Sequence, residues 1–167
     1  MSTLRLILGD QLNREVSSLS DCDKDNDTIL MCEVWDEATY VKHHKKKIAF
    51  IFSAMRHFAK DLEDDGYNVR YVKLNDDDNS GSFKGEVERA FNEKNYDALV
   101  FTAPGEYRLF DDMGSWQSDF DCDVEMREDD RYLCTPEEFK DWAEDRKQLR
   151  MEYFYREMRK KYKILVD

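Results

Sequence analysis

The sequence contains little proline, with 2 residues in 167, and only 6 glycines. This scarcity argues against a repetitive or low-complexity chain. The sequence also lacks any apolar run near the roughly 20 residues that span a bilayer, and its N-terminus does not have the pattern of a signal peptide. Its content of 41% hydrophobic and 13% aromatic residues is sufficient for a real core. The composition therefore predicts a globular protein without membrane partners.

The cysteines are few, and they do not form a C-x-x-C pair. They are scattered at Cys22, Cys32, Cys122 and Cys134. This distribution favours reduced thiols in a cytoplasmic protein over disulfides or zinc, and we predict no metal site. Acidic residues outnumber basic ones, with 38 Asp and Glu against 26 Lys and Arg, so the formal net charge is -12. The overall field therefore repels nucleic acid and anionic membrane, and any DNA contact would have to be local.

Short segments rich in aliphatic and β-branched residues recur along the chain. They predict strands at 4–8, 28–32, 69–74, 98–102 and 123–127. Helical patterns lie between most of them, the clearest being an apolar stripe over 48–62 that ends at Gly66 and a second helix over about 83–92. The alternation predicts an α/β fold: a Rossmann-like, doubly wound, five-stranded parallel sheet with helices on both faces.

The C-terminal part of the sequence is helical in character. Thr135-Pro136-Glu137-Glu138 combines an N-cap residue, a first-turn proline and first-turn acids, and a further helix starts near Gln148. We therefore predict a Rossmann-like domain over 1–134 and C-terminal helices over 135–167. The last helix has more apolar residues than a terminal helix needs, and KILVD ends the sequence without a polar tail. This predicts a linker and another domain beyond it.

Carboxylates follow the predicted strands where a ligand site is expected. If the strand order is 3-2-1-4-5, ligands bind between the tips of the first and fourth strands. These tips carry Gly9-Asp10-Gln11 and Pro104-Gly105-Glu106, with Cys32-Glu33-Val34 beside them. We expect Asp10, Glu33 and Glu106 to gather acceptor oxygens around one crevice, near Glu37. Such a crevice suits a pterin, a flavin-like ring or a sugar-alcohol chain. The alternative is that Asp10 caps a turn and Glu106 faces solvent.

Motifs for other chemistries are missing. Neither G-x-G-x-x-G nor G-x-x-x-x-G-K-[ST] follows the first strand, which disfavours a dinucleotide. The sequence shows no nucleophile elbow and no H-E-x-x-H, so we predict no catalytic residue. The basic run 43–47 either contacts phosphate or forms the exposed early turns of the long helix. Phe50 lies off the apolar stripe, where it meets a ligand, a partner domain or a second buried surface.

Longer motifs resemble a known family. They are LILGDQL at 6–12, CEVWDEATYVKHHKKKIAFIFSAMRHFA at 32–59, GSFKGEV at 81–87, PGEYR at 104–108 and MEYFYREMR at 151–159. Together they resemble the N-terminal domain of the prokaryotic (6-4) photolyases, the iron-sulfur bacterial cryptochromes and photolyases, over essentially the whole chain. The resemblance implies a domain that binds the antenna 6,7-dimethyl-8-ribityllumazine and passes its excitation to FAD. It also implies that FAD, the iron-sulfur cluster and DNA are bound by a separate helical domain, which this chain lacks.

The resemblance also implies which residues surround the antenna. These are Gly9, Asp10, Gln11, Cys32, Glu33, Val34, Glu37, Tyr40, Ile51, Pro104, Gly105 and Glu106. Asp10 and Glu37 are expected to accept hydrogen bonds from ring and ribityl donors, and Ile51 to pack on the ring plane. Trp35 and Asp36 depart from the family pattern, in which smaller or less acidic residues are expected, and a Trp35 that faces inward would narrow the pocket.

The sequence thus predicts the light-harvesting domain of a (6-4) photolyase or a related cryptochrome, acting in light-dependent DNA repair or blue-light sensing. Its expected partners are the chromophore and its own C-terminal helical domain, with catalysis outside this chain. One alternative is a stand-alone nucleotide-binding α/β module without catalysis. Another is an interaction domain whose C-terminal aromatic residues dock a partner.

Overall fold

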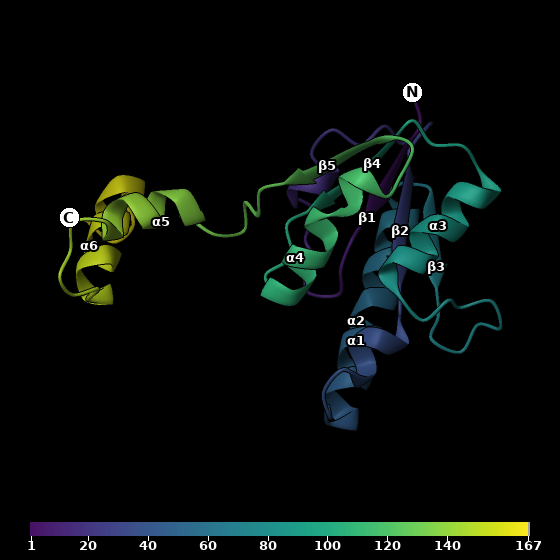
Figure 1. Cartoon of the computed structure of the whole chain (residues 1–167), viewed down its shortest axis with the longest axis horizontal. Coiled ribbons are helices and arrows are strands. Elements are labelled where there is room, and N and C mark those ends of the chain that lie inside the picture. The colour runs from purple at the N-terminus through teal and green to yellow at the C-terminus, as the bar shows by residue number, and fades with distance from the viewer. Residues whose placement is uncertain (167) are drawn as a thin grey trace. The chain divides into compact units, whose positions relative to one another are not determined.

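The computed structural model describes residues 1–166. These residues form two compact units, Met1–Arg127 and the residues from Glu128 onward (Figure 1). The first unit contains the whole sheet and the second contains two helices. The division directly follows the last strand. The functional boundary expected between residues 134 and 135 stays a prediction.

A five-stranded parallel sheet forms the centre of the first unit. Its strands are β1 (Thr3–Leu6), β2 (Thr28–Cys32), β3 (Val69–Val72), β4 (Ala98–Thr102) and β5 (Asp123–Arg127). They lie in the order β3-β2-β1-β4-β5, and Leu6 of β1 pairs with Leu30 of β2 and with Phe101 of β4. The predicted α/β class, parallel sheet and strand order are confirmed. All residues of β1 and β2 are buried, as near-continuous apolar strands require.

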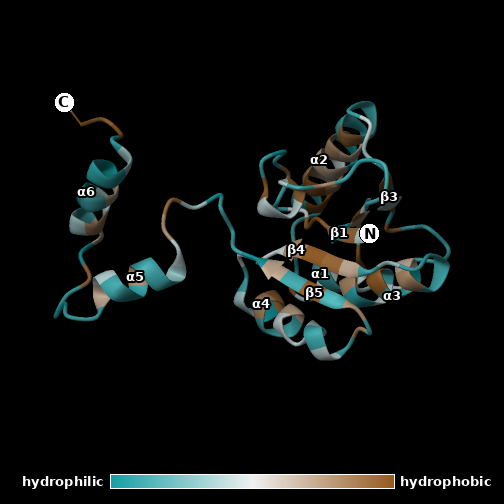
Figure 2. Ribbon diagram, turned by 90° about the horizontal axis from the view of Figure 1, so that it is seen from above, coloured by the Kyte–Doolittle hydropathy of each residue, from teal (hydrophilic) through white to brown (hydrophobic). Residues whose placement is uncertain are grey.

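Helices cover both faces of the sheet, as the doubly wound fold requires. Figure 2 shows α2 (Lys45–Asp64) on one side and α3 (Phe83–Glu93) and α4 (Tyr107–Gly114) on the other. Met55, Phe58, Ala59 and Leu62 of α2 pack in one core cluster with Ile29 and Met31 of β2 and with Ile7, which directly follows β1. A second cluster joins α3 and the fully buried Trp116, beyond α4, to the opposite face of the sheet.

Local signals explain where the two long helices begin and end. The His44 side chain accepts a hydrogen bond from the Lys46 backbone at the start of α2, and Ser82 caps α3 by accepting one from the Gly85 N–H at 3.0 Å. After α2 the chain turns at Gly66, whose φ of 88° lies in the left-handed region that glycine adopts without a steric cost. The helix ends at Asp64, two residues before the glycine predicted to cap it.

Two short helices were not predicted: α1 (Trp35–Thr39) and α4. Residues of α1 are half-buried or exposed, and Met113 is the buried residue of α4. The segment of α1 presents no apolar stripe, whereas α4 carries Leu109, Phe110 and Met113 at helical spacing but over only eight residues, too few for periodicity to identify a helix. The first strand also ends at Leu6 instead of Leu8, and the third at Val72 instead of Leu74. Ile7 and Leu8 remain buried beyond the end of β1.

The second unit is a helical pair, α5 (Pro136–Ala143) and α6 (Met151–Tyr162). Thr135 and Glu138 form a capping box at the start of α5. Phe154 of α6 meets the rings of Phe139 and Trp142 of α5 edge-to-face, with centroids 5.2 and 5.0 Å apart. An aromatic contact thus holds the two helices together.

Within residues 1–166, the structure has no helix that is both long enough and apolar enough to cross a membrane.

Candidate functional site

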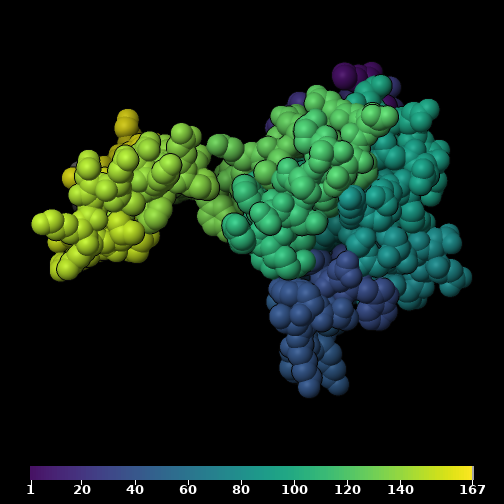
Figure 3. Space-filling view, in the orientation of Figure 1, coloured from purple at the N-terminus to yellow at the C-terminus, as the bar shows by residue number. Residues whose placement is uncertain are grey.

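A cavity of about 200 Å³ opens beyond the carboxyl ends of β1, β2 and β4. Its walls come from the ends of these strands and the segments after them, from α1 and α2, and from Phe83 of α3 and Leu109 of α4. The early turns of α2 and the neighbouring α1 project from the body of the first unit, as the blue atoms in Figure 3 show. The cavity therefore lies at the strand-order reversal between β1 and β4, the place where ligands bind in open parallel sheets.

Ten of the twelve predicted site residues line this cavity. They are Gly9, Asp10, Cys32, Val34, Glu37, Tyr40, Ile51, Pro104, Gly105 and Glu106. The lining also includes residues that sequence reasoning did not assign to the site: Leu8, Ala38, His43, Lys47, Ile48, Phe52, Met55, Phe83 and Leu109. Ile48, Phe52 and Met55 were recognised as part of the apolar stripe of α2. The periodicity of a stripe does not separate residues that face a core from residues that face a cavity.

Gln11 lies beneath the cavity instead of lining it. Its side chain is fully buried, accepts a hydrogen bond from the Leu8 backbone at 3.2 Å and donates one to the Thr102 carbonyl at 3.0 Å. It therefore joins the tip of β1 to the tip of β4. The amide in Gly9-Asp10-Gln11 satisfies backbone groups at the ends of two strands, which would otherwise be buried without partners.

Glu33 also faces away from the cavity, so it does not add an acceptor oxygen there. Its fully buried carboxylate accepts hydrogen bonds from Arg56 at 2.6 and 2.8 Å, from the Tyr71 hydroxyl at 2.7 Å and from the Leu74 N–H at 2.9 Å. Burial raises the pKa of Glu33, but these hydrogen bonds outweigh it and hold the pKa below its ordinary value. Glu33 thus ties the tip of β2 to α2 and to the segment after β3.

One wall of the cavity is apolar and closely packed. It consists of Ile51, Phe52 and Met55 on α2, opposite Gly9 after β1. A Cβ atom at Gly9 would lie 3.0 Å from Met55 Sδ and 3.2 Å from Ile51 Cγ2. Glycine is therefore the residue that lets the β1 tip approach α2 without displacing this wall.

The polar side of the cavity carries the carboxylates of Asp10, Glu37 and Glu106. Arg108 donates to both oxygens of Glu37 at 2.7 and 2.9 Å and to both oxygens of Glu106 at 3.1 Å. These hydrogen bonds, that to Glu37 foremost, raise the pKa of the Arg108 guanidinium above its ordinary value. A carboxylate has about four lone-pair sites, so a carboxylate paired with Arg108 retains capacity to accept from a ligand.

The outer end of the cavity carries cationic and aromatic groups. His43 and Lys47 line it, with Lys47 Nζ 3.4 Å from His43 Nδ1. The rings of Tyr40 and His43 meet edge-to-face with centroids 5.1 Å apart. The two ends of the basic run 43–47, His43 and Lys47, thus reach the cavity, whereas His44 caps α2.

The thiol of Cys32 belongs to the apolar side of the cavity. Burial, together with the nearby Glu86, strongly raises its pKa. The protonated thiol acts as a small apolar surface at neutral pH. Among residues 1–166, no three His, Cys, Asp or Glu side chains converge on a position that would hold a metal ion.

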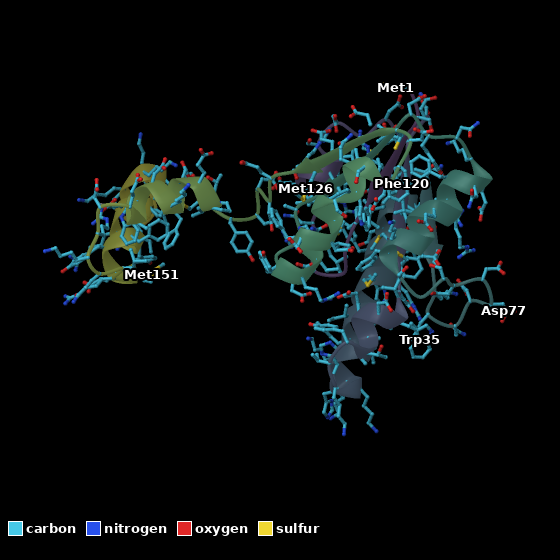
Figure 4. All side chains as sticks on the ribbon, viewed as in Figure 1. Met1, Trp35, Asp77, Phe120, Met126 and Met151 are labelled. Carbon is cyan, nitrogen blue, oxygen red and sulfur yellow. The ribbon has the colours of Figure 1, made fainter. Side chains whose placement is uncertain are left out.

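Trp35 does not narrow the cavity. Its side chain is 51% exposed and it is not part of the lining. Figure 4 shows it where α1 meets the loop that carries Asp77, and the adjacent Asp36 N–H donates to the Gly81 carbonyl at 3.0 Å. Phe50 is 74% exposed, so it packs neither in the core nor in the cavity.

Fold and cavity together define a class of protein: an open, parallel α/β domain with a ligand-sized cavity at its strand-order reversal. Comparison with known proteins is more specific. Residues 5–167 match the family model described as deoxyribodipyrimidine photo-lyase-related protein. The chain is also 52% identical, over all 167 of its residues, to a (6-4) photolyase of Agrobacterium fabrum. It spans 33% of the length of that relative.

The chain therefore belongs to the deoxyribodipyrimidine photo-lyase-related family. The match to an N-terminal part of a (6-4) photolyase agrees with the resemblance given by the sequence motifs.

Proposed function

We propose that this chain is the antenna-binding part of a photolyase-related flavoprotein, and that its cavity binds 6,7-dimethyl-8-ribityllumazine. The observation that carries the proposal is the two-sided chemistry of the cavity. Ile51, Phe52 and Met55 form an apolar wall, and Asp10, Glu37 and Glu106 contribute carboxylates on the polar side.

The apolar wall and the hydrogen-bond acceptors of the cavity fit such a chromophore. A flat ring loses apolar surface to water when it packs between aliphatic side chains and the strand tips. Its ring N–H group and the hydroxyls of its ribityl chain are hydrogen-bond donors, and ionised carboxylates only accept. In this proposal Asp10 and Glu37 accept from those donors, and Ile51 packs on the ring.

Light harvesting, rather than catalysis, is the proposed role of the cavity. The chromophore would absorb light and transfer its excitation to FAD. We propose that FAD, an iron-sulfur cluster and the DNA lesion are bound by a helical domain outside this chain, in a cytoplasmic protein. Light-dependent repair of DNA or blue-light sensing would then be an activity of the whole protein.

The test is an absorption and fluorescence titration of the purified chain with 6,7-dimethyl-8-ribityllumazine. Ile51→Trp places a larger ring in the cavity wall, and Phe50→Trp is its matched control, because the neighbouring Phe50 faces solvent. We expect the wild-type chain and the Phe50→Trp variant to shift the chromophore spectrum with the same dissociation constant. Ile51→Trp should weaken binding at least about tenfold by overfilling the wall.

Two results would contradict the proposal. One is a folded wild-type chain, verified by circular dichroism, that leaves the lumazine spectrum unchanged. The other is a lumazine signal that ATP displaces and that Ile51→Trp does not alter, since this would favour the stand-alone nucleotide-binding module.

A further inference from the structure

Arg108 joins two walls of the cavity without lining it. It projects from the first turn of α4 and binds Glu37 on α1 and Glu106 before α4. Its guanidinium carbon also lies 4.4 Å from the centre of the Tyr40 ring, within the range of a cation–π contact. All three partners line the cavity. We call Arg108 with Glu37, Tyr40 and Glu106 the Arg108 bridge.

The position of Arg108 is unfavourable for the helix itself. The amino end of a helix carries partial positive charge, so a cation in the first turn is repelled and an acid is favoured. Arg108 lies in the first turn of α4, close to the N-cap Glu106. Its hydrogen bonds to Glu106 and to Glu37 on α1 offset the repulsion.

Within residues 1–166, polar contacts on two sides of α1 add to the buried Val34 that precedes it. The residues of α1 are half-buried or exposed, so the helix adds little to the core. On one side the Asp36 N–H donates to the Gly81 carbonyl at 3.0 Å. On the other side Glu37 accepts from Arg108. Because α1 itself places no residue in the core, such polar contacts restrain the part of it beyond Val34.

We propose that Arg108 is a positioning residue of the cavity: it holds the α1 wall against the wall before α4, fixes the Glu37 carboxylate, and thereby slows release of the chromophore. The inference rests on the proposed function for its ligand. Its structural part, the restraint of α1 by Arg108, rests on the geometry alone. The proposed function and the positioning role of Arg108 can therefore be tested separately.

The first measurement needs no ligand. Hydrogen–deuterium exchange of the purified chain reports on the amides of α1 and of its C-cap Tyr40, whose N–H donates to the Asp36 carbonyl at 3.1 Å. Arg108→Ala should increase exchange over residues 35–41 while the midpoint of urea unfolding stays near that of wild type. Arg14→Ala is the matched control, since Arg14 forms an exposed ion pair with Asp65 at 2.7 Å and does not line the cavity.

The second measurement is the dissociation rate of 6,7-dimethyl-8-ribityllumazine, followed by fluorescence after rapid dilution. Arg108→Ala should release it about tenfold faster, the factor expected from losing a few exposed charged contacts. Arg108→Lys keeps the positive charge but loses the planar guanidinium that bonds two oxygens at once, so this variant should release the chromophore at an intermediate rate. Raising NaCl to about 1 M should accelerate release from wild type and leave Arg108→Ala unchanged, because salt screens exposed ion pairs.

The outcomes separate the two proposals. If wild type does not bind lumazine, the proposed function is overturned, and the exchange measurement still decides whether Arg108 restrains α1. If lumazine binds but Arg108→Ala releases it at the wild-type rate, the positioning role is overturned and the proposed function stands. Unchanged exchange over 35–41 in Arg108→Ala equally overturns the positioning role.

Discussion

Arg56 donates two hydrogen bonds, of 2.6 and 2.8 Å, to the two carboxylate oxygens of Glu33. Glu33 is fully buried, whereas Arg56 is 48% exposed. The Glu33 carboxylate is therefore shielded from water, and the partly exposed guanidinium of Arg56 on α2 balances its charge. The pair connects the end of β2 to the helix that forms the apolar wall of the cavity.

Glu33→Gln should destabilise the fold by about 2 kcal/mol at pH 7, because hydrogen bonds to a buried charge are lost and the donors around it lose their strongest acceptor. Urea unfolding measures this loss. Asp64→Asn is the control: Asp64 pairs with Lys60 on the surface of the same helix, with both side chains about two-thirds exposed, and its change should stay within about 0.5 kcal/mol. Equal effects of the two substitutions would contradict this account of Glu33.

Glu33 should also contribute to the pH dependence of stability. Its pKa in the folded chain lies below its ordinary value, so the unfolded chain binds the proton more tightly than the folded chain. The stabilisation is therefore present above the ordinary glutamate pKa of about 4.3 and is lost as the pH falls through and below it. Urea unfolding between pH 7 and pH 3 should show a smaller acid loss in Glu33→Gln than in wild type. A parallel loss in both chains would argue against the prediction.

Gly9→Ala should weaken chromophore binding by displacing the apolar wall. The added methyl group meets Met55 and Ile51 at 3.0 and 3.2 Å, and making room for it should cost about 1 kcal/mol or more of stability. Fluorescence titration and thermal unfolding measure the two effects. Gly114→Ala is the control, since a Cβ there meets no described atom within 4 Å; it should leave binding unchanged. Wild-type affinity in Gly9→Ala would show that the wall adapts freely.

Arg5→Met should destabilise the chain by about 3–5 kcal/mol, because Asp27 would keep a buried charge without its cation. Both side chains are 4% exposed and their atoms lie 2.8 Å apart. Asp27→Asn should be destabilising as well, and the double variant should lose less than the sum of the two single losses. Chemical unfolding of all four chains provides the measurement. Strict additivity would mean that the two residues do not interact energetically.

Cys32 should be the last cysteine to react with a thiol reagent in the folded chain. It is 1% exposed, and burial raises its pKa strongly, which leaves little of the reactive thiolate at pH 8. Burial also raises the pKa of Cys22, to about 11, but that side chain is only partly buried. Alkylation with iodoacetamide, followed by mass spectrometry of peptides over time, gives the order of reaction. Early labelling of Cys32 would show that the cavity wall opens readily.

Periodicity predicted the sheet and the long helices well because burial leaves a clear pattern there. The largely buried strands at 28–32 and 98–102 agree with the structure residue by residue, and so does 123–127, whose residues are half-buried or exposed. Ile7 and Leu8 extended the first predicted strand because they are buried, yet they lie beyond its ladder. Burial and strand pairing are different properties, and a sequence reports the first more directly.

The candidate site was predictable at the level of strand tips, because a parallel sheet brings their carboxyl ends to one edge. The direction of individual side chains was not. Gln11 and Glu33 turn toward backbone groups and Arg56, whereas Asp10 and Glu37 line the cavity. The identity of a polar residue in the sequence does not show whether its side chain will bond a backbone group, pair with an arginine or line a cavity. Arg108 was part of a recognised motif, but its contact with α1 depends on tertiary structure.

The pairing of β1 with β4, in which Leu6 lies beside Phe101, also has a consequence for synthesis and turnover. The cavity needs residues from Leu8 to Leu109, so it forms only after a long loop has closed, a slow step in folding. A chromophore that binds this cavity would bind the finished fold alone, adding about 2.7 kcal/mol of stability at a concentration of one hundred times its Kd. Because proteases remove the unfolded chain, cells short of chromophore would then hold less of the protein. Under the proposed function, each remaining copy without chromophore would also collect less light.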